Sequence, residues 1–329
     1  MKKILVLALI SGIVFSCKKS SNDETSTDSP LTTNSESPYP DTVWATTGTG
    51  PHLILKFKFD STQIRLNAVG QPDPYVLNSD TAAISPVFHQ MASHYVELAP
   101  NDMTALGAGQ VLYRAPEAVK SGTNAILFNK SVVARDGATF FSIPLSQITP
   151  DTYKWLRVSL SYQNYDIKYL VSGNYGTGTV ASFLGFSTYV EKYKIKDRDM
   201  VPSSAVGGPN VPHAQGYWGF ETYFAAANFP YSSDGQAPSG ATTVVNPNPN
   251  SPIFPGSCVV TAEFANASGT VNQPLVITGT ETQDIIVTVS LSTNKSFEWK
   301  DVNHNKLYEP LNGDYPVDMG VRGMIPKVQ

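Results

Sequence analysis

Charged side chains and long hydrophobic segments are both scarce in this 329-residue sequence. Only 15% of the residues are charged and the formal net charge is −4, which argues against a nucleic-acid-binding protein, because such a protein needs a basic face. The most apolar segment, Ile4–Phe15, covers about a dozen residues and is too short to cross a bilayer of about 30 Å as a helix. We therefore expect no membrane-spanning helix and no nucleic-acid partner.

The common catalytic motifs are also missing. The sequence contains no H-E-x-x-H, no G-x-S-x-G, no Walker loop and no convincing local pair of catalytic carboxylates. Because the two carboxylates of a glycosidase can lie far apart in a sequence, this absence disfavours an enzyme without excluding one. The one G-x-G-x-x-A match, Gly176–Ala181, precedes no helix, so we interpret it as a turn that enters a strand.

The N-terminus combines a positive pair, an apolar run and a cysteine. Two lysines precede Ile4–Phe15, and Ser16 precedes Cys17. This order resembles the signal and lipobox of bacterial lipoproteins. The resemblance implies that residues 1–16 are a signal peptide that is removed, and that Cys17 is then acylated with chains such as palmitate. Two acyl chains already anchor a protein stably, because each buried methylene contributes about 0.8 kcal/mol.

The residues after Cys17 carry a basic pair followed by an acidic pair within Lys18–Glu24. This leader resembles those of outer-membrane lipoproteins of the Bacteroidota, some of which reach the cell surface. The resemblance implies a protein held to the outer membrane by its lipid anchor and facing either the periplasm or the cell surface. Once Cys17 is acylated, Cys258 is the only remaining thiol, so an internal disulfide is excluded. Because Cys258 opens an apolar run, we interpret it as a buried small side chain.

Composition divides the chain into a spacer and a body. Residues 17–50 are almost entirely small polar residues and prolines, which bury too little apolar surface to offset chain entropy. We therefore expect a lipidated cysteine and flexible tether over 17–50 and a folded body over 51–329, with Trp44 as a residue that could already belong to the body. Loop-like stretches at 199–216 and 231–256 could subdivide the body, but we favour one domain.

The body shows the period-two pattern of half-buried strands. The clearest cases are 53–60, 155–162 and 284–291, in which apolar residues alternate with polar ones. In the second of these, Arg157, Ser159 and Ser161 are expected to face solvent. The inward-facing sets are Leu53, Leu55, Phe57 and Phe59; Leu156, Val158, Leu160 and Tyr162; and Ile285, Val287, Val289 and Leu291.

Helical patterns are nearly absent, with single turns expected only at Val87–Ser93 and Pro100–Thr104. Many short strands separated by Gly, Pro, Asn and Asp predict an all-β fold, an antiparallel β-sandwich of immunoglobulin-like or jelly-roll-like type with long loops. The segment Ile143–Val158 resembles a turn and strand found in β-sandwich lipoproteins of the Bacteroidota, which supports the same fold. Weaker strands are expected at Tyr95–Leu98, Ala125–Phe128, Phe140–Pro144, Val180–Tyr189, Gly216–Phe224, Cys258–Phe264 and Leu275–Thr278.

The best candidate site lies near the C-terminus, where oxygen-bearing residues alternate. Calcium takes six to eight oxygen ligands, and alternation lets a curled loop direct successive oxygens inward. Lys306 stands where an EF-hand loop has its glycine, and Asn312 replaces the final glutamate, so the alternative is an Asx-rich turn that satisfies its own backbone. The predicted calcium ligands are Asp301, Asn303, Asn305, Leu307 through its carbonyl, Glu309 and Asp314.

Two other groups of residues deserve interpretation. His89 and His94 lie five apart, which does not align them on a helix, so we interpret them as hydrogen-bonded rather than as transition-metal ligands. Aromatic residues cluster in 217–224 and in 162–175, where core packing is favoured over a sugar-binding platform. We therefore expect a non-catalytic binding or surface module, with a glycan or an envelope protein as its partner. The alternatives are a secreted β-sandwich hydrolase and a structural envelope component stiffened by calcium.

Overall fold

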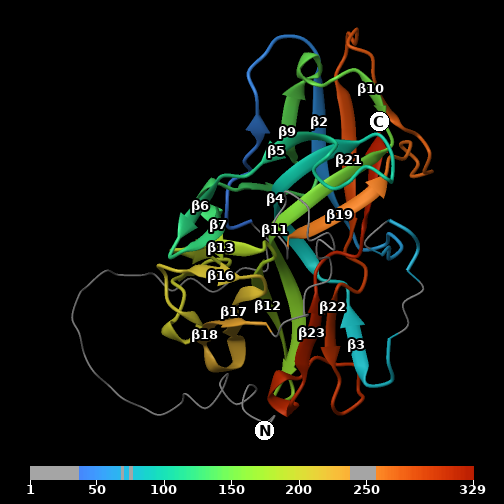
Figure 1. Cartoon of the computed structure of the whole chain (residues 1–329). Helices are drawn as coiled ribbons and strands as arrows, with labels where there is room; N and C mark the ends of the chain where they lie inside the picture. The colour runs from blue at the N-terminus through green and yellow to red at the C-terminus, as the bar shows by residue number, and fades with distance from the viewer. Residues whose placement is uncertain (1–36, 68–69, 74–76, 238–256) are drawn as a thin grey trace.

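The computed structural model describes residues 37–67, 70–73, 77–237 and 257–329. The predicted signal peptide, Cys17 and most of the predicted tether lie outside these ranges. The described residues contain strands and five short 3-10 turns but no α-helix, so the all-β prediction is confirmed (Figure 1). Among these residues no helix has the length and hydropathy needed to cross a membrane. The 3-10 turns are Phe128–Lys130, Leu145–Gln147, Ser204–Val206, Ala225–Ala227 and Pro310–Asn312.

One layer is an eight-stranded antiparallel sheet that runs the length of the molecule (Figure 1). Its central strand, β11 (Trp155–Val171), pairs with β4 and β12 along most of its length and with β19 at its start. The order is β18 (Phe229–Gln236), β17 (Tyr217–Phe224), β12 (Asn174–Phe183), β11, β4 (Val87–Ala99) and β5 (Gln110–Arg114), with β19 (Cys258–Glu263) on β11 and β8 (Val132–Arg135) on β4.

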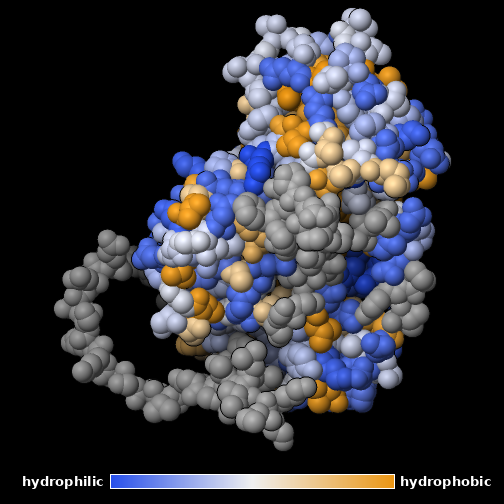
Figure 2. Space-filling view, viewed as in Figure 1, coloured by the Kyte–Doolittle hydropathy of each residue, from blue (hydrophilic) through white to orange (hydrophobic). Residues whose placement is uncertain are grey.

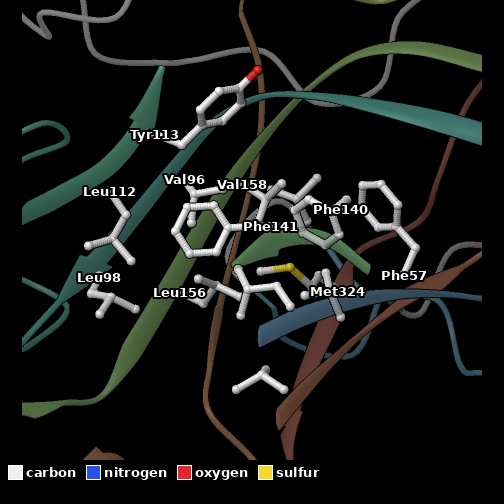
Figure 3. Close-up of a cluster of buried hydrophobic side chains, with 14 of the residues drawn as sticks. Phe57, Val96, Leu98, Leu112, Tyr113, Phe140, Phe141, Leu156, Val158 and Met324 are labelled. Atoms are coloured by element: carbon white, nitrogen blue, oxygen red, sulfur yellow. The ribbon is translucent and has the colours of Figure 1, made fainter. Parts of the chain in front are cut away.

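Two sheets form the facing layer. A five-stranded sheet has the order β1 (Trp44–Ala45), β9 (Thr139–Pro144), β2 (His52–Asp60), β21 (Ile285–Ser292) and β24 (Met324–Val328). A three-stranded sheet has the order β23 (Tyr315–Met319), β22 (Phe297–Lys300) and β3 (Thr81–Ile84). Most pairs are antiparallel, but β2 runs parallel to β21 and β1 runs parallel to β9. The layers enclose the largest apolar cluster, in which Phe57 and Phe140 pack near Leu156 and Val158 (Figure 3). This arrangement is the predicted sandwich.

Smaller sheets cover the outer face of the eight-stranded sheet. The four-stranded sheet and the two-stranded sheet of β14 (Tyr193–Lys194) and β15 (Asp199–Met200) contribute to this covering, whereas Tyr153, Leu275 and Ile277 of the other two-stranded sheet pack into the largest apolar cluster. A second apolar cluster, which includes Tyr162, Phe183 and Tyr217, lies beneath this covering. The strands of the four-stranded sheet are β16 (Pro212–Ala214), β13 (Ser187–Tyr189), β7 (Thr123–Leu127) and β6 (Glu117–Lys120), and those of the other two-stranded sheet are β10 (Asp151–Tyr153) and β20 (Leu275–Ile277).

Strands with one covered face follow their predicted pattern. In β2, Leu53, Leu55 and Phe57 are fully buried, and Phe59 packs against the same cluster. In β21, Val287, Val289 and Leu291 are fully buried, and Ile285 packs beside them. Each strand presents its polar residues on the opposite face, which is why the alternation was visible in the sequence.

The predicted pattern of β11 is only half correct. Leu156, Val158 and Leu160 join the largest cluster, but Tyr162 joins the second cluster on the opposite face. The pairing with β4 shifts register between Leu160 and Tyr162, and such a bulge reverses which residues face inward. Arg157, Ser159 and Ser161 were expected to face solvent but are buried, because both faces of β11 are covered.

Three segments differ from their predicted conformation. Val87–Ser93, expected as a helical turn, is the start of β4; from His89 onward this strand is buried on both faces and therefore shows no alternation. The strand expected at Val180–Tyr189 divides into β12 and β13. The loop expected from 231 begins as β18.

Part of the expected tether packs on the body. Trp44 stacks on Phe141 with ring centroids 5.1 Å apart, and the Tyr39 amide donates to Gln90 Oε1 at 3.2 Å. These residues are too apolar and too well bonded to behave as spacer. The folded body therefore includes residues from Ser37 onward.

Candidate functional site

The predicted calcium ligands lie in one loop, residues 301–314, which connects β22 to β23 at one end of the sandwich (Figure 1). We call this segment the acidic loop. The Tyr308 carbonyl accepts a hydrogen bond of 2.8 Å from the Leu170 amide at the end of β11. The Asp301 amide donates to the Asp80 carbonyl at 2.9 Å, just before β3. The acidic loop therefore joins the two layers.

Two aspartates fix the backbone of the acidic loop. Asp301 accepts hydrogen bonds from the amides of Asn305 at 3.2 Å and Lys306 at 2.8 Å. Asp314 accepts from the amides of Val302 at 2.9 Å and Glu309 at 2.8 Å. Both aspartates are almost fully buried, so these amides replace the water that the carboxylates lose.

Glu309 is the point on which the amide side chains converge. Asn303 Nδ2 and Asn305 Nδ2 both donate to Glu309 Oε2 at 2.5 Å, and Asn312 Nδ2 donates to Oε1 at 3.0 Å. The bonds from Asn303 and Asn305 hold the pKa of Glu309 below its usual value, although the nearby charge of Asp301 opposes this. The structure therefore brings together five of the six predicted ligands, and the sixth, Leu307, donates its amide to Asn305 Oδ1 at 2.8 Å.

The residue that departs from the EF-hand pattern adopts the conformation that the pattern requires. Lys306 has φ of 62°, in the left-handed region for which the EF-hand loop uses glycine, and His304 has φ of 57°. The curl expected of a calcium loop is therefore present without the glycine.

The acidic loop supplies part of the oxygen ligand set that a hard cation requires. Three buried carboxylates lie in one loop, and none belongs to an ion pair within the described ranges. However, no group of three or more His, Cys, Asp and Glu side chains there is arranged to hold a metal. A cation would therefore depend on oxygens of Asn303, Asn305 and the backbone, which suits calcium better than a transition metal.

The two histidines of β4 each face a carboxylate on another strand. His94 Nε2 lies 2.8 Å from Glu117 Oε1, and His89 Nε2 lies 3.0 Å from Asp166 Oδ1. Burial raises the pKa of Glu117, but hydrogen bonds from His94, Arg114 and Asn124 outweigh burial and lower it to about 2. His94 is therefore hydrogen-bonded to a carboxylate, whereas His89 Nε2 lies within ion-pair distance of one without a well-aligned hydrogen bond.

The aromatic clusters divide into core and surface. Tyr162, Tyr165, Tyr169 and Tyr217 are buried, as favoured from the sequence. By contrast, three rings that alternate along β17 are half-buried, and we call them the aromatic strip: Trp218, Phe220 and Phe224. Figure 2 shows that apolar side chains on the visible face are scattered among hydrophilic ones.

Glycines on the two strands next to β17 leave space that two rings of the aromatic strip occupy. Trp218 pairs directly with Gly235 of β18, and a Cβ added to Gly235 would come within 2.5 Å of Trp218 Cζ2. Phe220 occupies the equivalent space over Gly178 of β12. A ring that fills the space of a missing side chain packs on the backbone of the neighbouring strand. The sequence identified the aromatic cluster over 217–224 but favoured core packing for it, although glycines inside strands were a usable signal.

Comparison of the chain with protein-family models, curated proteins and solved structures found no match. The functional evidence therefore rests on the acidic loop and the aromatic strip.

Proposed function

We propose that this chain is a lipid-anchored lipoprotein of the outer membrane whose β-sandwich is a non-catalytic glycan-binding module. The observation that supports it most is the aromatic strip, in which Trp218 and Phe220 lie over glycines and are only partly buried. The anchor rests on the lipobox ending at Cys17, which would hold the module at the envelope.

The chemistry of the strip suits a sugar. A sugar ring has an apolar C–H face that packs on a flat aromatic ring and a rim of hydroxyls that needs hydrogen-bonding neighbours. Ser182 lies opposite Trp218 across the sheet, and Ser233 lies opposite Phe220. Ser182 is almost fully buried, and the Ser233 hydroxyl is buried without a hydrogen-bond partner, so the strip offers flat apolar surface with one unpaired hydroxyl beside it.

The test is calorimetric titration of the full chain with neutral hexasaccharides of glucose, xylose and mannose. We expect Trp218→Ala to weaken binding at least tenfold, about 1.4 kcal/mol, because a central aromatic residue often dominates a binding site. Tyr175→Ala is the matched control, since Tyr175 is a 75% exposed ring on a strand next to β17 but outside the strip. Equal affinities for the two variants would refute the assignment of the strip.

The anchor has a separate test. Labelling with a palmitate analogue should modify the wild-type chain and leave Cys17→Ser unmodified, and the variant should leave the membrane fraction. Retention of label by Cys17→Ser would contradict the lipoprotein assignment.

A calcium-stiffened scaffold is the second candidate, and the acidic loop favours it. Bound calcium would neutralise Asp301, Glu309 and Asp314 and would stiffen the loop that joins the layers. A ligand that binds only the folded state raises the unfolding temperature. We expect the midpoint to rise with calcium and fall with chelator, and an unchanged midpoint would exclude this role.

A further inference from the structure

The rings of the aromatic strip continue from β17 onto the neighbouring strand β18. Residues directly opposite each other in an antiparallel pair point to the same face of the sheet. Phe224 pairs with Phe229 of β18, and Thr222 pairs with Tyr231. We call this surface the hairpin face, and its members are Trp218, Phe220, Thr222 and Phe224 of β17 and Phe229, Tyr231, Ser233 and Gly235 of β18.

The rings of the hairpin face form a continuous line. The centroid of the Tyr231 ring is 6.5 Å from that of Phe220 and 6.2 Å from that of Phe224. A strand rises about 3.3 Å per residue, so the line from Trp218 to Phe224 is roughly 20 Å long. Because a sugar ring is about as large as one aromatic side chain, a surface of this length accommodates several consecutive sugars.

The hairpin face becomes more accessible toward the turn between its two strands. Phe220 packs against the buried cluster that contains Trp299, whereas Phe229 is 54% exposed. Phe224 and Tyr231 lie between these two positions and are half-buried. A ligand can therefore reach the line of rings from the end at which Phe229 lies.

The residues of the hairpin face carry no charge. The acidic residues of the two strands, Glu221 and Asp234, occupy the alternating positions that point to the opposite face. Glu221 accepts hydrogen bonds from the amides of Lys196 at 3.1 Å and Arg198 at 3.0 Å, and Asp234 accepts one from the Ser203 amide at 2.7 Å. The opposite face is therefore covered by protein, and the hairpin face suits an uncharged ligand.

Hydroxyl groups on the hairpin face are few. Thr222 Oγ1 already donates to the Thr177 carbonyl at 2.9 Å and lies 2.7 Å from the Tyr169 hydroxyl. Ser233 Oγ is buried without a partner. Recognition of a chain end requires hydrogen bonds directed to its terminal hydroxyls, whereas stacking on rings is available to every sugar of a chain. Affinity at this face should therefore increase with the number of rings that a chain covers.

We propose that the hairpin face binds the interior of a linear, uncharged glycan that lies along β17, rather than the end of a chain. This inference rests on the proposed glycan-binding function and specifies its ligand. It predicts that chain length determines affinity, and that Phe229 contributes only when a chain is long enough to reach it.

The test compares Phe229→Ala with Tyr175→Ala in the full chain, since both change an exposed ring and Tyr175 lies outside the hairpin face. Calorimetric titration uses disaccharides and hexasaccharides of glucose, xylose and mannose. We expect the wild-type chain to bind one hexasaccharide at least about tenfold more tightly than the matching disaccharide. Phe229→Ala should weaken hexasaccharide binding about three- to tenfold and leave disaccharide binding unchanged, and Tyr175→Ala should change neither.

A second ligand separates interior from end recognition. Borohydride reduction opens the terminal ring of the hexasaccharide and leaves the interior sugars intact. The reduced hexasaccharide should bind the wild-type chain with an affinity within about twofold of the original. A much larger loss would overturn the proposal, because it would show that the chain end is bound.

The outcomes distinguish this inference from the proposed function. Hexasaccharide binding that Trp218→Ala weakens and Phe229→Ala leaves unchanged overturns the extended site and keeps glycan binding. Equal affinities for disaccharide and hexasaccharide have the same consequence. A dimer in light scattering that Phe229→Ala dissociates would overturn the proposal, because a second copy of the chain would then occupy the face. Absence of binding to every hexasaccharide by the wild-type chain rejects both proposals.

Discussion

Replacing Glu97 by glutamine should destabilise the fold more than almost any other single-atom change. Glu97 is fully buried in β4, opposite Arg157 in β11, and the Arg157 Nη1 to Glu97 Oε1 distance is 3.2 Å. The carboxylate also accepts hydrogen bonds from the Tyr95 hydroxyl and from the amides of Gly107 and Gly109. It therefore holds the loop between β4 and β5 on the sheet.

The size of the effect depends on Arg157, which stays buried after its negative partner has been removed. Arg157 is 8% exposed; its Nη1 also donates to the Ala105 carbonyl, and its Nη2 donates to the Thr104 carbonyl. Removing the negative partner of a buried ion pair costs about 3–5 kcal/mol. In a protein of this size that loss lowers the unfolding midpoint by roughly 10 °C. Urea unfolding followed by tryptophan fluorescence would measure the free energy of unfolding.

A control variant and a double variant test the cause of this destabilisation. Glu263→Gln, on the neighbouring strand β19, alters a half-buried carboxylate and should change stability by less than about 0.5 kcal/mol. Glu97→Gln combined with Arg157→Met should be less destabilised than the sum of the two single changes. A loss below about 1 kcal/mol in Glu97→Gln would refute the reasoning.

Other predictions concern protonation, metal and thiol chemistry. Glu117 has a pKa of about 2, below its ordinary 4.5, so its contribution of about 2–3 kcal/mol should be complete above pH 4.5 and vanish toward pH 2. Urea midpoints of wild type and Glu117→Gln should therefore converge on acidification, and a constant gap would contradict this. Asp301→Asn should reduce any calcium-induced rise in the unfolding midpoint, and an undiminished rise would remove Asp301 from the ligands. Burial raises the pKa of Cys258 to about 12, so in Cys17→Ser this thiol should react with a thiol reagent only after unfolding, and rapid native labelling would disprove its burial.

Sequence patterns were informative where only one face of a strand is covered. β2 and the first half of β21 show their alternation because their other face is only partly covered, whereas Ser290 and Ser292 at the end of β21 are fully buried. β4 and β11 are buried on both faces, so β4 shows no alternation and the bulge after Leu160 reverses the pattern of β11. No local pattern could place Arg157 beside Glu97, because 60 residues separate them.

The acidic loop and the aromatic strip differ in how far the sequence could locate them. The loop is local, so its ligand candidates could be named from spacing, although the left-handed conformation of Lys306 could not. The strip depends on pairing between distant strands. Tyr217 is fully buried and Trp218 is half-buried, and only the orientation of β17 distinguishes them. The glycine beneath Trp218 lies on a segment that the sequence had assigned to a loop.

The most direct test of glycan binding is titration of the full chain, Trp218→Ala and Tyr175→Ala with the neutral hexasaccharides. We expect measurable binding by the wild-type chain, an affinity at least tenfold weaker for Trp218→Ala, and an unchanged affinity for Tyr175→Ala. No binding by the wild type, or identical binding by all three chains, would contradict the account.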